Sequence, residues 1–281
     1  MAQSIDSLVE LAPRFGAVVL DQWGVLHNGT APYGRAVETV NHLHSSGVRL
    51  AVLSNSGKRA APNAARIEAI GFDPSAFEIV MSSGEALWWD IAEGRVTERR
   101  LFAIERAPGD ARAWAEGLRV NLVVDLADAD AILLMGVPDT AAPDAFEAVL
   151  DAAFARDLPV MCTNPDRASP RAGGQVVASP GALAHAYAAK GGQVRFYGKP
   201  HLPVFRSLEA TLGLPPDQLV MVGDSLEHDI AGAASAGWSS IFIRGGLHHN
   251  AFAHGGIAET IAALAQADDA PLPDFTLAEL Q

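Results

Sequence analysis

The sequence is poor in cysteine and in basic residues, and both shortages narrow what this chain can be. A single cysteine, Cys162, among 281 residues excludes an intramolecular disulfide and fits a reducing, cytoplasmic compartment. Lysine and arginine together number 20 against 33 aspartates and glutamates, which gives a formal net charge of −13. Nucleic acids and anionic membranes are bound by basic patches, so neither is an expected partner.

Long apolar runs and two common enzyme motifs are also missing. The longest apolar runs, such as the one over residues 131–135, are far too short to span a bilayer. The amino-terminal segment has no basic start followed by an apolar stretch, so it does not read as a secretory signal. No G-x-G-x-x-G follows an expected strand and no G-x-S-x-G occurs, which removes the main support for dinucleotide binding and for a serine hydrolase.

Apolar runs of strand length alternate with segments of helical periodicity. This alternation predicts an α/β fold with a parallel sheet and right-handed crossovers. The expected strands lie at Ala17–Leu20, 48–53, 78–81, 101–104, 122–124, 131–135, Val160–Cys162, 194–197, 219–222 and 241–243. The expected helices lie at 33–44, Ala60–Ile70, 110–116, 143–155 and 181–190.

The length of the chain favours two domains. We assign residues 1–85 and 193–281 to one domain that is discontinuous in sequence, and residues 86–192 to an α/β domain inserted into it. The strand expected at 194–197 marks the return to the first domain. Residues 268–274 are expected to be a surface segment before a short last helix.

Four polar segments each follow an apolar run that is expected to form a strand. They are Asp21, Ser54-Asn55-Ser56, Lys199 in Tyr197-Gly198-Lys199-Pro200, and the run from Gly223 to Asp229 that contains Asp224 and Ser225. Open α/β sheets bind ligands at the carboxyl ends of their strands. One sheet edge is therefore expected to present all four segments.

These residue types suit phosphoryl chemistry. Asp21 and Asp224 are hard oxygen ligands of the kind that hold Mg²⁺ beside a substrate phosphate. Asp21 is also a candidate nucleophile, which would form an aspartyl-phosphate. Lys199 offers a fixed positive charge to the phosphoryl oxygens, and Ser54 offers a hydroxyl donor.

At these residues the chain resembles the haloacid dehalogenase-like (HAD) hydrolase superfamily, and within it the NagD-like class (subfamily IIA) with a large α/β cap. The resemblance implies a Rossmann-like parallel-sheet core, a cap inserted between Ser56 and Lys199, Mg²⁺ as cofactor, a small phosphorylated metabolite as substrate, and a homodimer. Residue by residue, it implies catalytic roles for Asp21, Ser54 and Lys199, metal binding by Asp21, Asp224 and the backbone carbonyl of Trp23, phosphate binding with the help of Asn55, and supporting roles for Asp229 and Ser225.

One position departs from the family pattern. Phosphatases of this family carry a second aspartate two residues after the nucleophile, as general acid and base, and this chain has Trp23 there. An indole cannot exchange a proton with the leaving group, and positioned acid–base catalysis typically contributes about 10²–10⁴-fold in rate. His27, Glu227 and His228 lie in or beside the motifs and are the alternative proton carriers.

The inserted domain is expected to select the substrate. The segment Thr163-Asn164-Pro165-Asp166-Arg167 resembles a cap segment of the class, and Asn164 and Asp166 are candidates to bind substrate hydroxyls. The same residues are also good turn formers, so both interpretations stand. Trp88-Trp89 is interpreted as packing, and His248, His249 and His254 as a loop near the rim of the site, because their spacing fits no zinc motif.

The sequence therefore predicts a magnesium-dependent HAD-like hydrolase, a phosphatase of a small metabolite that acts through Asp21. Two alternatives remain. In the first, Asp21 takes part in cleaving a different bond, carbon–halogen or carbon–phosphorus, since members of the superfamily with those activities also lack the second aspartate. The chain can also be a catalytically weak protein that binds a metabolite for regulation.

Overall fold

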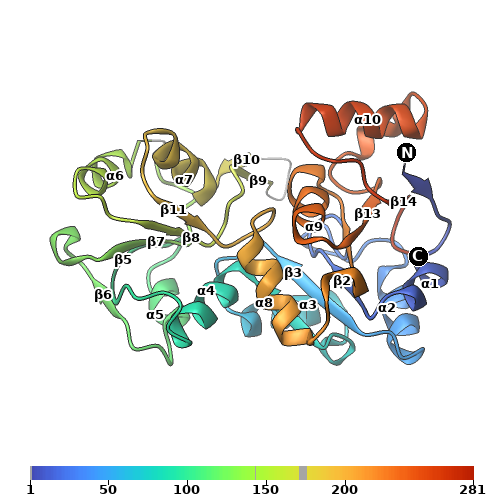
Figure 1. The fold of residues 1–281 in the computed structure, drawn as a ribbon, viewed down its shortest axis with the longest axis horizontal. Coiled ribbons are helices and arrows are strands. Elements are labelled where there is room, and N and C mark those ends of the chain that lie inside the picture. Colours follow the sequence, from blue (N-terminus) through green and yellow to red (C-terminus); the bar gives the residue numbers. More distant parts are fainter. Residues whose placement is uncertain (1, 143, 171–175) are drawn as a thin grey trace. The chain divides into compact units, whose positions relative to one another are not determined.

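The computed structural model describes residues 2–142, 144–170 and 176–281. The chain divides into two compact units. The first unit contains residues 1–54, 61–81 and 199–281, and the second contains residues 55–60 and 82–198. Figure 1 shows the elements of both units in sequence colours.

The first unit is built on a seven-stranded sheet with the order β1-β14-β13-β12-β2-β3-β4. Its strands are β1 (Gln3–Ser4), β2 (Ala17–Leu20), β3 (Leu50–Ser54), β4 (Ile79–Ser82), β12 (Leu219–Gly223), β13 (Ser239–Ile243) and β14 (Phe275–Leu277). The helices of eight or more residues are α2 (Ala36–Ser45), α3 (Ala60–Ile70), α8 (Leu202–Leu212) and α10 (Ile257–Ala267), with the shorter α1 (Leu8–Leu11) and α9 (Ala231–Ala236).

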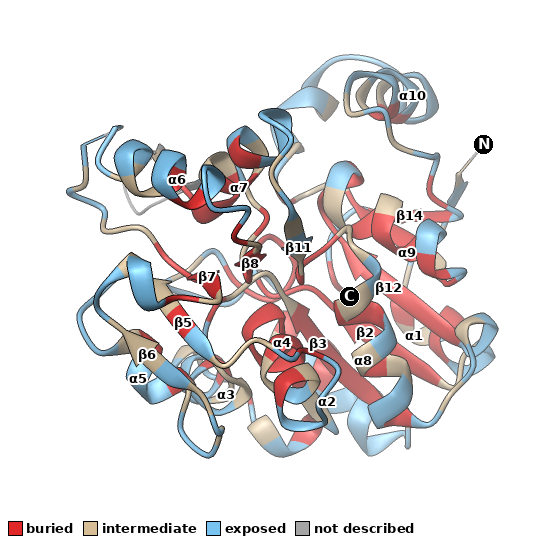
Figure 2. Ribbon diagram, turned by 60° about the vertical axis from the view of Figure 1, so that its left-hand side comes forward, coloured by how far each residue is buried: buried red, intermediate tan, exposed pale blue. Residues whose placement is uncertain are grey.

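The centre of this sheet is buried, as Figure 2 shows for β2 and β12. All four residues of β2 and all five of β12 are buried, the pattern of parallel strands covered on both faces. Strand β2 pairs in parallel with β12 and with β3, and Leu20 is opposite both Val222 and Val52. This register brings the carboxyl ends of the three strands to one edge of the sheet.

The second unit has its own parallel sheet of five strands, ordered β11-β8-β7-β5-β6. Its strands are β5 (Arg100–Ile104), β6 (Asn121–Val123), β7 (Ala131–Leu134), β8 (Val160–Cys162) and β11 (Val194–Phe196), beside an antiparallel pair of β9 (Ala168–Pro170) and β10 (Val176–Ala178). Its helices are α4 (Ser83–Ala92), α5 (Asp110–Trp114), α6 (Glu147–Phe154) and α7 (Pro180–Ala189).

The Rossmann-like, parallel-sheet α/β fold predicted from the sequence is confirmed. Two elements differ from the prediction. Strand β11 pairs with β8 and so belongs to the second unit, whereas we had expected residues 194–197 to resume the first domain. The chain end forms strand β14 between β1 and β13 instead of a last helix. Pro143, where helix 143–155 was expected to begin, lies outside the described residues.

Within the part of the chain that the structure describes, no helix is both long and apolar enough to cross a membrane.

Candidate active site

Three carboxylates of the first unit meet at the carboxyl edge of its sheet. Asp21 follows β2, and its N–H donates to Val222 O at 2.9 Å, which ties it to the neighbouring β12. Asp224 follows β12 directly, and Asp229 comes from the π-helical turn Leu226–Ile230 just beyond it. One ligand atom from each of the three residues lies within 4.8 Å of the others. Among the described residues, this is the one group of three such side chains close enough to hold a metal ion.

Lys199 joins this cluster with its ammonium group. Its Nζ donates to Asp21 Oδ1 at 2.7 Å and to Asp229 Oδ1 at 2.6 Å. The lysine is only 3% exposed, so its charge is held among the carboxylates away from bulk water. Charge-assisted hydrogen bonds of this kind fix the positions of both partners.

The local charge is unbalanced, because one ammonium faces three carboxylates. Burial raises the pKa of Asp21 to about 7; Lys199 lowers it, but less than burial and the charge of Asp229 raise it. Burial, with the charges of Asp21 and Asp229, also holds the pKa of Asp224 well above its ordinary range. A divalent cation supplies the positive charge that this group lacks, so the donor set fits Mg²⁺.

The backbone of two glycines lies close to the carboxylate of Asp224. A Cβ on Gly24, which has a φ of +90°, would lie 1.7 Å from Asp224 Oδ2. A Cβ on Gly246 would lie 2.3 Å from the same oxygen, and the Leu247 N–H donates to it at 2.7 Å. The backbone around Asp224 therefore leaves no room for a side chain and fixes the direction of this carboxylate.

Trp23 follows the nucleophile candidate by two positions and belongs to the first unit. Its side chain is 36% exposed, and its indole nitrogen would be 3.1 Å from a Cβ on Gly29. Trp23 and His27 form an isolated β-bridge, and the His27 carbonyl accepts from the Gly24 N–H at 3.1 Å. These contacts close a tight turn around Trp23, the residue at the sequence position for which the resemblance implies a second aspartate.

His27 is not suited to replace that aspartate. Its ring is buried, and Nδ1 accepts from the Gly29 N–H at 3.1 Å. Burial and the nearby charge of Arg66 lower the pKa of His27 to about 4, so the ring is neutral at physiological pH. His228, another predicted proton carrier, lies with its Nδ1 2.9 Å from Ser225 Oγ.

Ser54 and Ser225 occupy the positions that the sequence indicated. Ser54 is the last residue of β3, at the same end of the sheet as Asp21. The Ser225 N–H donates to Asp229 Oδ2 at 3.1 Å, and its hydroxyl accepts from the His228 N–H at 3.2 Å as the cap of the π-helical turn. Ser225 therefore shapes the segment that carries Asp229.

The remaining predicted site residues, Asn55, Asn164 and Asp166, lie together in the second unit. Asn55 Nδ2 donates to Asp166 Oδ1 at 2.7 Å, and the Asp166 N–H donates to Asn164 Oδ1 at 3.0 Å. Asn164 thus makes the side-chain turn that was the alternative interpretation of this segment. Asp166 contacts the residue that directly follows Ser54, a link that its position in the sequence did not indicate.

Sequence reasoning missed Gly24, Gly246 and the Leu247 N–H, which surround Asp224. Gly24 lies four residues after the end of β2, and Gly245-Gly246 begins two residues after the end of β13, so a glycine in the loop that follows a strand was the available signal. It also missed Tyr33, whose pKa is raised by burial and by the charge of Asp224. No local pattern marks that tyrosine.

Comparison with known proteins identifies the family. Residues 18–111 match the family described as haloacid dehalogenase-like hydrolase, and residues 196–269 match one described as HAD-hydrolase-like. The chain belongs to the haloacid dehalogenase-like hydrolases. The predicted NagD-like class of this family is confirmed as well, and the protein is a hydrolase.

Its relatives include phosphatases. Human chronophin is 29% identical in an alignment of 262 positions that covers 86% of this chain and 85% of chronophin. A dihydroxyacetone phosphatase from Corynebacterium glutamicum is 32% identical over 120 residues, and the match spans 41% of this chain and less than half of that protein, 44%. The solved structure of a haloacid dehalogenase-like hydrolase from Brucella suis covers 99% of this chain, and all of that chain is matched, with a TM-score of 0.80 and 28% identity.

Proposed function

We propose that this protein is a magnesium-dependent phosphatase of a small phosphorylated metabolite, with Asp21 as nucleophile. The observation that carries the proposal is the buried contact of Asp21 with Lys199, beside Asp224, at the carboxyl edge of the sheet. The name of one relative, a dihydroxyacetone phosphatase, supports the substrate class.

Asp21, Asp224 and the backbone carbonyl of Trp23 are the proposed ligands of the metal. Asp229 shares the cluster but is bound to Lys199 and to the Ser225 N–H, so we assign it the supporting role of holding Lys199 in place. When bound, Mg²⁺ offsets the negative charge of the carboxylates and of the substrate phosphate.

In the proposed reaction an oxygen of the Asp21 carboxylate attacks phosphorus and forms an acyl-phosphate. The bond from phosphorus to the leaving-group oxygen breaks, and that oxygen leaves with the electron pair and takes up a proton from solvent water. Water then attacks the acyl-phosphate, releases orthophosphate and restores the carboxylate. Lys199 and Ser54 are proposed to bind the phosphoryl oxygens, with backbone N–H groups of the segment after Ser54, Asn55 included.

The second unit is proposed to act as the cap, and Asp166 and Asn164 to contribute to substrate choice. Because Asn55 and Asp166 are hydrogen-bonded, a change in either residue is expected to affect both phosphate binding and selectivity. The proposed location is cytoplasmic, and the proposed assembly is a homodimer.

The test is phosphate release from p-nitrophenyl phosphate and from a panel of metabolite phosphates, with and without Mg²⁺. Asp21→Asn is the test variant, and Asp217→Asn, at an exposed position of the same unit, is the matched control. We expect metal-dependent turnover that Asp21→Asn abolishes and the control retains. Wild-type protein that binds Mg²⁺ but releases no phosphate would instead favour a different bond or a regulatory binding protein.

A further inference from the structure

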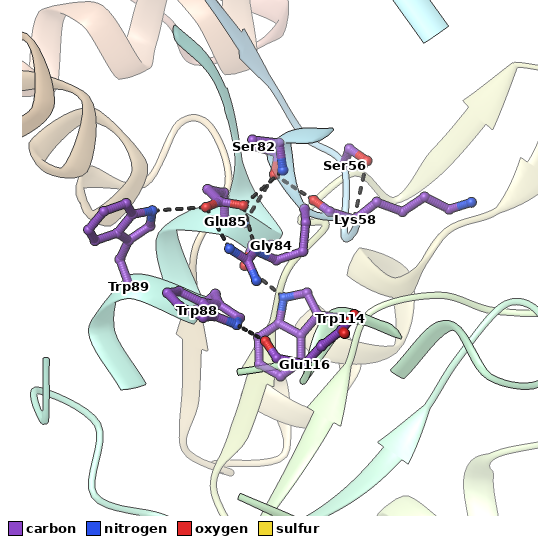
Figure 3. A network of polar contacts seen from close by, with 11 residues as sticks. Ser56, Lys58, Ser82, Gly84, Glu85, Trp88, Trp89, Trp114 and Glu116 are labelled. Carbon is purple, nitrogen blue, oxygen red and sulfur yellow. Dashed lines mark hydrogen bonds and ion pairs between the residues drawn. The ribbon is translucent and has the colours of Figure 1, made fainter. Parts of the chain in front are cut away.

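The loop of residues 55–60 directly follows Ser54 and is held by the beginning of α4. Gly84 N–H donates to Ser56 O at 3.0 Å, and Ser82 Oγ donates to Lys58 O at 2.5 Å. Both ends of this contact belong to the second unit. Figure 3 shows Ser82, Gly84 and Glu85 gathered beside Ser56 and Lys58.

Glu85 is the centre of this network. Its carboxylate accepts from Arg59 Nε at 2.6 Å, from the second guanidinium nitrogen of Arg59 at 3.0 Å, and from the Ala60 N–H at 2.8 Å. Trp89 Nε1 adds a fourth bond at 2.9 Å. The residue is 5% exposed, and although burial raises its pKa, the bonds from Arg59 and Ala60 together lower it below its ordinary value. Glu85 therefore stays ionised and holds the last two residues of the loop.

Trp88 and Trp89 each contact one partner of the Arg59–Glu85 ion pair. The Arg59 guanidinium lies 3.8 Å from the centre of the Trp88 ring, a cation–π contact. Trp88 Nε1 donates to Glu116 O at 3.1 Å, and Trp114 Nε1 donates to Gly84 O at 2.8 Å (Figure 3). These contacts give Trp88 and Trp89 a function beyond the packing that the sequence predicted.

The loop also approaches α4 and the residue after β7 too closely for larger residues at two glycine positions. A Cβ on Gly84 would lie 2.2 Å from Gly57 O, and a Cβ on Gly57 would lie 2.4 Å from Met135 O. The loop is thus held by a bidentate ion pair, three hydrogen bonds of its backbone and two close glycine approaches. They specify one conformation of residues 55–60.

We propose that Glu85 is a positioning residue that, through Arg59 and the Ala60 N–H, fixes the phosphate-binding segment beginning at Ser54. The inference rests on the proposed phosphatase function. Donors placed before the substrate arrives stabilise the transition state without reorganisation, and a misplacement of about 1 Å can cost about 10²-fold in rate. Glu85 does not itself touch the phosphate in this scheme.

The experiment compares Glu85→Gln, Arg59→Lys and Trp89→Phe with Glu78→Gln as the matched control. Glu78 accepts a bidentate pair from Arg49 at 2.7 and 2.6 Å in the first unit, but that pair is solvent-exposed. For each variant we would measure kcat and KM with p-nitrophenyl phosphate, inhibition by orthophosphate, the melting temperature, and hydrogen exchange of the peptide that contains residues 55–60.

We expect Glu85→Gln to lower kcat/KM for p-nitrophenyl phosphate by about ten-fold or more, with a lower kcat. We also expect it to weaken inhibition by orthophosphate. Arg59→Lys keeps the charge and is expected to show a smaller loss. Trp89→Phe removes one of four bonds, so it provides a folded variant if Glu85→Gln is unstable. For each variant, hydrogen exchange at residues 55–60 should become faster in proportion to the loss in kcat/KM. The kcat/KM of the control should stay within about two-fold of wild type.

Lower melting temperatures with unchanged kcat and unchanged orthophosphate inhibition would overturn the inference, since Glu85 would then serve stability alone. Faster exchange at residues 55–60 with wild-type kinetics would overturn it too. If wild type releases no phosphate, the proposed function fails by itself. The effect of Glu85→Gln on exchange then still decides whether this residue fixes the loop.

Discussion

At the scale of single residues, Asp21 shows how the fold changes the chemistry of a side chain. Its position after β2 could be inferred from the sequence, because an apolar run followed by aspartate marks a strand end. The excess of negative charge around it could not, since Asp229 and Lys199 meet Asp21 only when distant segments fold together. Burial in that assembly is the main reason why the pKa of Asp21 is raised to about 7; the charge of Asp229 raises it further, and Lys199 opposes the shift.

This shift predicts how the stability of the metal-free protein depends on pH. A carboxyl whose pKa is raised on folding stabilises the protein at low pH, and that contribution is lost as pH rises from about 4 towards 7. Asp21→Asn is neutral at every pH. In the presence of a chelator, we therefore expect the variant to melt at least ~3 °C above wild type at pH 8, which is about 1 kcal/mol for a chain of this size.

At pH 5, where Asp21 is protonated in folded wild type, the difference in melting temperature should be clearly smaller than at pH 8, because only part of the contribution is lost between pH 4 and pH 5. Thermal unfolding followed by circular dichroism at both values provides the measurement. Asp217→Asn, at an exposed position of the same unit, is the matched control. An equal difference between Asp21→Asn and wild type at pH 5 and pH 8 would contradict the buried, charge-crowded environment of Asp21.

Trp23 leads to a prediction about the leaving group. Without a carboxyl at this position, alkyl phosphates should be poor substrates, whereas p-nitrophenolate needs little protonation to leave. Trp23→Asp should raise kcat/KM for an alkyl phosphate by about ten-fold or more and change that for p-nitrophenyl phosphate little. Trp23→Asn is the control, because it shortens the side chain equally but carries no proton to donate.

The ratio of the two kcat/KM values is the decisive quantity. A wild-type enzyme that already hydrolyses both substrates equally well would show that another group supplies the proton. Equal gains for Trp23→Asp and Trp23→Asn would show that the indole acts through its bulk.

At the scale of elements, local pattern predicted the position of most strands but not every partner. Residues Ala17–Leu20 and Val160–Cys162 form strands with the predicted bounds. Strand β11 was found, yet its pairing with β8 depends on contacts that no local pattern contains. The chain end, Phe275–Leu277, is too short to show a period and becomes a strand because β1 and β13 flank it.

The side chain of Asp274 connects this last strand to its neighbour. Its Oδ2 accepts from the Ser240 N–H at 2.9 Å and from Ser240 Oγ at 3.1 Å, one residue before β14 begins. Asp274→Ala should therefore lower the free energy of unfolding by about 1–3 kcal/mol, because a backbone donor of β13 loses its partner. Urea denaturation measures the change, with Asp217→Ala as a surface control. A loss no larger than that of the control would mean that solvent replaces Asp274 at no cost.

At the scale of the whole molecule, two features set the conditions in which the site works. The chain leaves the first unit after Ser54 and returns at Ala61, and it leaves again after Met81 and returns at Lys199. Ser54 and Lys199 therefore both lie at points where the chain passes between the units. The sequence predicted an inserted domain over residues 86–192, whereas the contacts within each unit also assign residues 55–60, 82–85 and 193–198 to the second unit. The second feature is the net charge of −13, which repels a phosphorylated substrate at long range.

That repulsion predicts that association, and not the chemical step, improves with ionic strength. Raising KCl from about 20 to about 200 mM shortens the screening length from roughly 20 Å to roughly 7 Å, so the distant acidic residues act less on the incoming anion. We expect kcat/KM for p-nitrophenyl phosphate at saturating Mg²⁺ to rise about two-fold, and kcat to stay constant as the internal control. A fall in kcat/KM would mean that the bound metal and Lys199 attract the substrate over a longer range than the acidic surface repels it. In that case the positive charge of the site would be the dominant field that the substrate meets.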